Sequence, residues 1–150
     1  MISLHNKMLH LLLLALLMVP VANAAPWDKS QRLKKMIEAY DTANMETIEG
    51  SMVKIYEITP KNSPAYGIHI IMNTEKEAVN IHVGPGWYVK NITNVIKEGD
   101  KISVTGARTK ELTGYDKINY RSIRAAEIRK NGELLLKLRD ENGRPLWSGF

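Results

Sequence analysis

Two histidines are the residues of this chain best suited to chemistry, and their spacing predicts that they lie side by side. His69 and His82 each belong to a stretch in which apolar and polar residues alternate, the pattern of a strand with one buried face. Setting Ile70 opposite Ile81 brings apolar residues together on that face. Three apolar pairs result: Ile68 with Val83, Ile70 with Ile81, and Met72 with Val79. The same register sets His69 opposite His82.

Two opposed imidazoles can share a metal ion, since directly opposed Cβ atoms on neighbouring strands lie about 4.5–5.5 Å apart. Imidazole nitrogen suits zinc, copper, nickel and iron, so a divalent transition metal is the cofactor to expect if there is one. Two ligands leave the site incomplete, and spacing fixes no third, although Glu57, Glu75 and Glu77 are candidates. The alternative is that both histidines occupy the polar, outer face of a hairpin, beside Ile71 and Asn80.

A second candidate site follows at Gly84-Pro85-Gly86-Trp87-Tyr88, where a constrained turn precedes two aromatic residues. Glycine allows tight turns and close backbone approach. One interpretation is a ligand pocket floored by Trp87 and Tyr88, with Gly84 and Gly86 shaping its backbone. The other is an aromatic plug under a turn. The sequence holds no GxSxG turn, phosphate-binding glycine loop or haem-attachment motif, so an enzyme is not expected.

The elements that must position these residues begin with a helix and continue as strands. From Asp28 to Met45, apolar residues recur at helical spacing, and residues 25–47 form the predicted N-terminal helical segment. A short helix is predicted between Trp87 and Lys97. Six strands are predicted, at residues 51–59, 66–73, 78–83, 101–107, 117–128 and 133–139.

Three strands, a short helix and two more strands is the order of the OB-fold, a small Greek-key barrel. Asn131-Gly132 is a strong hairpin signal, and it adds the last strand as an extension. We therefore predict a mainly β, OB-like barrel of five to six strands over residues 48–150, with a helix before it and a short helix between the third and fourth strands. A β-sandwich is the alternative, but it leaves the linking helix unexplained.

The N-terminus predicts export. Residues 1–24 combine a weakly basic start, an apolar stretch from Leu11 to Val19, and the small residues Ala22 and Ala24 before a cleavage site. The apolar stretch is shorter than the roughly 20 residues of a spanning helix, and Pro20 follows it, so a retained anchor is the weaker interpretation. The mature chain, from residue 25, is expected in the periplasm without a transmembrane segment.

Composition excludes several classes of function. The chain has no Cys, which rules out disulfides, thiolate metal sites and covalently attached haem. The formal net charge is +5, and basic residues are interspersed with acidic ones, which argues against nucleic-acid binding. The basic clusters at residues 32–35 and 121–124 are expected to be solvated.

Three segments carry a resemblance: H-V-G-P-G-W-Y at 82–88, G-D-K-I-S-V-T-G at 99–106, and L-R-D-E-N-G-R-P-L-W at 138–147. Together they resemble small secreted bacterial OB-fold domains, in particular the domain of the magnetosome-associated proteins MamS and MamX, over about residues 48 to 148. The resemblance implies an accessory module of the periplasm or magnetosome lumen. Members that carry c-type haem use CxxCH motifs, which this chain lacks.

Two functions follow. The first is a non-enzymatic binding or assembly module that holds a periplasmic or membrane-associated protein partner or a small ligand. The alternative is a metal-handling accessory protein in which His69 and His82 bind iron, copper or zinc.

Overall fold

The computed structural model describes residues 29–61, 64–109, 113–115 and 118–149 of the 150-residue chain. The predicted signal peptide lies outside this part. The helical elements are α2 (Lys29–Glu38), η1 (Thr42–Asn44), α3 (Gly86–Val89), α4 (Ile92–Val95) and η2 (Leu146–Gly149). The strands are β1 (Met45–Ile58), β2 (Gly67–Asn73), β3 (Ala78–Pro85), β4 (Lys101–Arg108), β5 (Thr113–Tyr115), β6 (Ile118–Lys130) and β7 (Glu133–Lys137).

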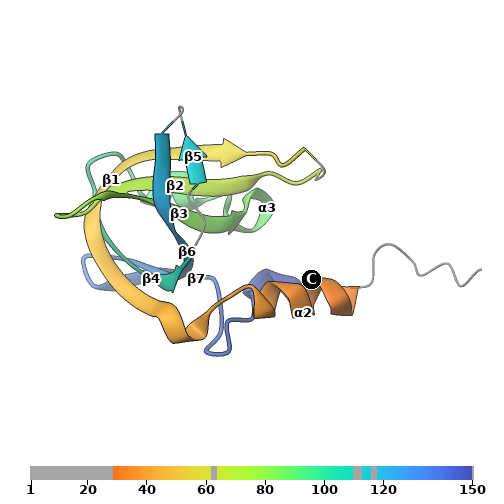
Figure 1. Ribbon diagram of the computed structural model, residues 1–150. Helices are drawn as coiled ribbons and strands as arrows, with labels where there is room; N and C mark the ends of the chain where they lie inside the picture. The colour runs from red at the N-terminus through yellow and green to blue at the C-terminus, as the bar shows by residue number, and fades with distance from the viewer. Residues whose placement is uncertain (1–28, 62–63, 110–112, 116–117, 150) are drawn as a thin grey trace, which may run out of the picture.

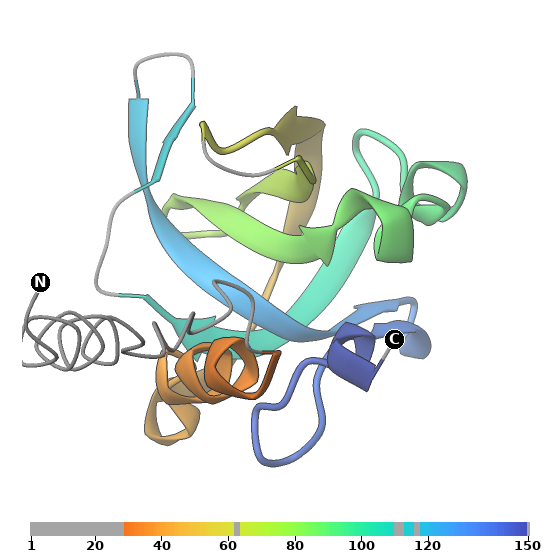
Figure 2. The same cartoon turned by 90° about the vertical axis from the view of Figure 1, so that its right-hand side faces the viewer.

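Five strands pair in a closed ring (Figures 1 and 2). The order β3-β2-β1-β4-β6 is antiparallel throughout, and β6 returns to pair in parallel with β3. The strands β5 and β7 are added to β6. The mainly β, OB-like fold with an N-terminal helix and helical link is therefore confirmed. Six of the seven strands were predicted, and β5 was not.

The core fills the inside of this ring with aliphatic side chains. Residues 70, 72, 79, 81, 104, 123 and 128, all Ile, Val or Met, are almost completely buried there. Val89, Ile92 and Ile96, from the link between β3 and β4, close the same core. The predicted single helix over 87–97 is instead two short turns, α3 and α4, because β-branched residues at 92, 93 and 95 lower helix propensity.

The N-terminal helix is shorter than the sequence predicted. It ends at Glu38, and after the short turn η1 the strand β1 already begins at Met45, where residues 45–47 had been assigned to the helical segment. The Asp41 side chain accepts a hydrogen bond from the backbone N–H of Ala43 and so starts the new turn. The residues of β1 from Met45 on pair with β4 instead of continuing the helix.

The helix α2 lies against one end of the ring, beside η2 (Figure 2). None of its ten residues is buried, and its apolar residues Leu33, Met36 and Ile37 are half-covered. Tyr40, just after the helix, is buried against Ala107 and Ala126. Among the described residues, no helix combines the length and apolar character that crossing a membrane requires.

Candidate functional site

The predicted histidine register is present in the structure. Ile70 pairs with Ile81, and His69 pairs with His82, whose ring centroid lies 4.3 Å from its own. Met72 also pairs with Val79 as predicted. The predicted Ile68–Val83 pair is wrong, because the register shifts between Ile68 and His69 and sets Ile68 opposite Gly84.

The histidines lie on the outside of the ring but are not exposed there. Alternation along β2 and β3 turns both rings away from the core, to the face that also holds Ile71 and Asn80. His69 is only 8% exposed, and Asn80 is fully buried. The Tyr56 ring lies 5.4 Å from that of His69, and Asn80 Oδ1 lies 3.3 Å from His69 Nδ1. The expected polar outer face is therefore a largely buried polar cluster.

This environment favours neutral imidazoles. Burial lowers the pKa of His82 to about 3, helped by the nearby positive charges of His69 and Arg124. Burial also lowers the pKa of His69, and its contact with Asn80 partly opposes that shift. Arg124 reaches this cluster because β6 pairs in parallel with β3 and sets it opposite His82.

The described residues supply no evident third metal ligand. No group of three or more metal-binding side chains comes together among them. Glu57 is exposed at the end of β1, and Glu75 and Glu77 lie at the β2–β3 turn. Glu77 is also engaged by Arg108 and Arg121.

The turn after β3 holds one exposed aromatic residue and one packed one. Trp87 is 51% exposed, whereas Tyr88 is half-buried between Trp87 and Trp147, with centroid distances of 5.9 and 5.7 Å. A Cβ on Gly84 would lie 3.3 Å from the Trp147 ring, and one on Gly86 would overlap the ring of Tyr66. The space beside these two glycines is therefore occupied by the rings of Trp147 and Tyr66.

Sequence reasoning missed Arg139, which is 8% exposed. Its guanidinium carbon lies 4.3 Å from the ring centroid of Tyr40 and 5.3 Å from that of Trp147. Arg139 Nη1 donates a hydrogen bond to the carbonyl oxygen of Gly143 at 2.8 Å. Burial lowers its pKa to about 10, with Tyr40 opposing and Arg124 reinforcing that shift. An arginine after an apolar strand gave no sign of this burial.

Hydrogen bonds of the residue after Arg139 close the C-terminal loop. Asp140 Oδ1 accepts hydrogen bonds from the backbone N–H groups of Asn142 and Arg144. Gly143 has φ +79°, and its Cα lies against the Tyr40 ring. Residues 138–147, which resemble a family segment, therefore hold Tyr40 and Trp147 against the buried guanidinium of Arg139. We call this arrangement the clamp.

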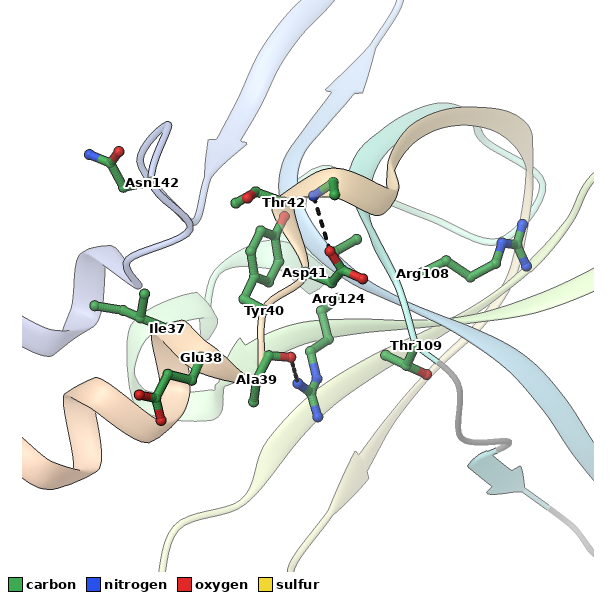
Figure 3. A pocket seen from close by; sticks show the side chains of 12 residues that line it. Ile37, Glu38, Ala39, Tyr40, Asp41, Thr42, Arg108, Thr109, Arg124 and Asn142 are labelled. Atoms are coloured by element: carbon green, nitrogen blue, oxygen red, sulfur yellow. Dashed lines mark hydrogen bonds between the residues drawn. The ribbon is translucent and has the colours of Figure 1, made fainter.

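An open pocket of about 600 Å³ lies beside this clamp, between the α2–η1 segment and strands β4 and β6 (Figure 3). Tyr40, Ala107 and Arg124 form part of its wall. Arg124 Nη1 donates a hydrogen bond to the Ala39 carbonyl oxygen. The cluster at 121–124 was expected to be solvated; Arg121 is 64% exposed, but Arg124 is half-buried. The pocket joins distant segments, so no local pattern marked it.

Fold and sites together define a mainly β protein with an OB-like strand ring, a buried histidine pair and an exposed tryptophan. The chain belongs to the MamS/MamX magnetosome protein family, whose family model matches residues 44–135. No characterised protein in a curated collection matches it.

Two solved structures are similar. The small single-stranded DNA-binding protein from Streptomyces coelicolor has 14% identity and a TM-score of 0.42 over 58% of this chain and 91% of its own. The mitochondrial single-stranded DNA-binding protein Rim1 from S. cerevisiae has 17% identity and a TM-score of 0.40 over 65% of this chain and 96% of its own.

Proposed function

We propose that this protein is a non-enzymatic binding or assembly module, exported to the periplasm or the magnetosome lumen, that contacts a protein partner through Trp87. The observation that carries the proposal is the 51% exposure of Trp87 on a turn held in place by packed neighbours. Large aromatic residues that stay exposed on a rigid support are typical centres of protein interfaces. Membership of the magnetosome family supports the compartment.

The surroundings of Trp87 support a preformed contact surface. Gly86 N–H donates a hydrogen bond to the Tyr66 carbonyl oxygen at 2.9 Å, which ties the turn to the segment before β2. Tyr66 is itself 36% exposed, so two large aromatic residues are exposed at this turn. A rigid surface binds with little loss of conformational entropy.

Charge pairing supports a protein partner over nucleic acid. Several basic side chains are already engaged by carboxylates: Arg108 with Glu46 and Glu77, Arg121 with Glu77, Arg129 with Glu127, and Lys130 with Asp100. Such pairs neutralise the charges that would contact phosphates. The histidines suited to acid-base chemistry are largely buried, which supports a binding role over an enzymatic one.

Site-specific photocrosslinking in the native cell envelope tests this function. With benzoylphenylalanine in place of Trp87, we expect one dominant protein adduct. The same substitution at Leu134, which is 40% exposed on β7, is the matched control and should give no such adduct. Mass spectrometry of the captured chain should find Ala25 as its first residue.

Trp87→Ala should lower recovery of the same partner at least tenfold while leaving thermal stability unchanged, because an exposed side chain contributes little to the core. Equal adducts at positions 87 and 134, or undiminished recovery with Trp87→Ala, would contradict the proposal.

Metal handling is the second candidate, and the adjacency of the two imidazoles favours it. The wild-type protein and a His69→Ala/His82→Ala variant should be titrated at pH 7 with Fe(II), Cu(II) and Zn(II). If this function is right, the wild type takes up one equivalent of one metal and the variant takes up none. Equal uptake by both proteins rejects it. The positive charge of Arg124 beside His82 works against this candidate.

A further inference from the structure

The pocket beside Tyr40 is large enough for a small ligand. Its volume of about 600 Å³ falls within the range of roughly 300–1,000 Å³ that small-molecule sites occupy. One wall is firm, since Tyr40 and Ala107 are 4% and 3% exposed and pack together with Ala126. The rest of the lining comes from the residues around Tyr40 in the segment from Glu38 to Ala43, from Thr109 directly after β4, and from Arg124 on β6.

The carboxylates that line this pocket already have donors. Asp41 accepts hydrogen bonds from the backbone N–H of Ala43 and the side-chain amide of Asn44. Glu38 forms an ion pair with Lys34 at 3.8 Å, one turn earlier on α2. Both carboxylates are therefore already engaged by groups of the protein itself.

Arg124 is the cation with donors to spare. Its one hydrogen bond to a described residue uses Nη1 and the Ala39 carbonyl oxygen, and no carboxylate among those residues lies within ion-pair distance. A guanidinium has five N–H groups, so most of the donors of Arg124 have no partner within the part of the chain that the structure describes. Arg108 also lines the pocket but is engaged by Glu46 and Glu77, and its guanidinium points away from Arg124 (Figure 3).

A second cation lies behind the wall of the pocket. Arg139 stacks on the Tyr40 ring and has no carboxylate partner among the described residues, and its charge acts on that of Arg124. Two uncompensated guanidinium groups in one neighbourhood raise the local concentration of anions. Thr42 and Asn142 also line the pocket, but they lie on the other side of Tyr40 from the Arg124 guanidinium (Figure 3).

We propose that this pocket binds a small oxyanion, a carboxylate or a phosphate, with Arg124 as its anchor. The anion accepts hydrogen bonds from those N–H groups of Arg124 that have no partner among the described residues. This site is separate from the Trp87 surface, and neither proposal depends on the other.

Titration of the ¹⁵N-labelled protein with inorganic phosphate, and separately with acetate, at constant ionic strength tests the site by NMR. We expect saturable shifts of the backbone amides of Ala39, Thr109 and Arg124, which line the pocket around the guanidinium. The tighter of the two anions identifies the class of ligand. Arg124→Gln should weaken binding at least tenfold, since it removes a charge-assisted pair of hydrogen bonds.

Arg121→Gln is the matched control, because Arg121 lies on the same strand, is 64% exposed and contacts Glu77 instead of the pocket. It should leave both affinities unchanged. Arg124→Lys keeps the charge and the fold, and it should weaken binding by a smaller factor than Arg124→Gln. If Arg124→Gln does not fold, the lysine variant and the location of the wild-type shifts decide. Shifts that do not saturate, or equal affinity in the Arg124 variants and the wild type, overturn the proposal.

Discussion

Acidification from pH 7 to pH 4 is expected to destabilise this protein by at least about 3 kcal/mol, because two largely buried histidines must stay neutral in the folded state. The pKa of His82 falls from 6.5 to about 3 on folding, and that of His69 also falls. Below pH 6.5 these two histidines bind protons in the unfolded chain but not in the folded protein. The free energy of unfolding therefore decreases as the pH falls. For His82 the loss is about 1.4 kcal/mol per pH unit between pH 6.5 and pH 4, and the lowered pKa of His69 adds to it.

Urea unfolding at pH 7, 6, 5 and 4 measures this loss. A His69→Asn/His82→Gln variant keeps polar side chains of similar size and should lose much less stability over the same interval. The ion-paired Asp100 does not interfere, because its lowered pKa places its contribution below about pH 4. If the variant and the wild type show the same slope, the histidines are not the cause of acid sensitivity.

The alternation of residues was enough to predict the face on which the histidines lie, but not their burial. Alternation fixes which side chains share a face, because neighbours along a strand point to opposite sides. Whether that face meets water depends on segments distant in sequence. His69 therefore pairs with His82 as predicted while being 8% exposed. The register shift between Ile68 and His69 could not be predicted from the alternation of residues either.

Gly50 shows why the start of the first strand was misplaced. The first strand was predicted to begin at residue 51, directly after Gly50, since glycine usually interrupts regular structure. In the structure Gly50 is inside β1, at the point where that strand passes between β2 and β4. A Cβ there would meet the carbonyl oxygen of Asn73, so the glycine allows a close crossing of backbones instead of a turn.

The segments at 82–88 and 138–147 that resemble the family were recognisable in the sequence, but the contact between them was not. Trp147 contacts Gly84 and Tyr88 on one side and Arg139 on the other. Arg139 in turn reaches Tyr40, just beyond the N-terminal helix. These contacts join segments far apart in the chain, and no local spacing encodes them. The aromatic plug was a correct interpretation for Tyr88, whereas Trp87 projects outward.

Gly143→Ala is expected to destabilise the protein by about 2–5 kcal/mol. Two causes add: a non-glycine residue at positive φ costs about 1–2 kcal/mol, and forcing an extra group into a packed site costs about 1–3 kcal/mol. Gly143 has φ +79°, and its new Cβ would overlap the Tyr40 ring. Moving that ring would disrupt its stacking on Arg139.

Gly132→Ala separates the two causes of this destabilisation. Gly132 also has φ +79°, but a Cβ there would meet nothing within 4 Å, so the variant should lose only the backbone component, about 1–2 kcal/mol. Urea unfolding of both variants at pH 7.5 gives the difference. A larger loss for Gly143→Ala measures the contact with Tyr40, whereas equal losses would mean that Tyr40 moves aside freely. In that case the clamp around Arg139 would not hold the C-terminal loop.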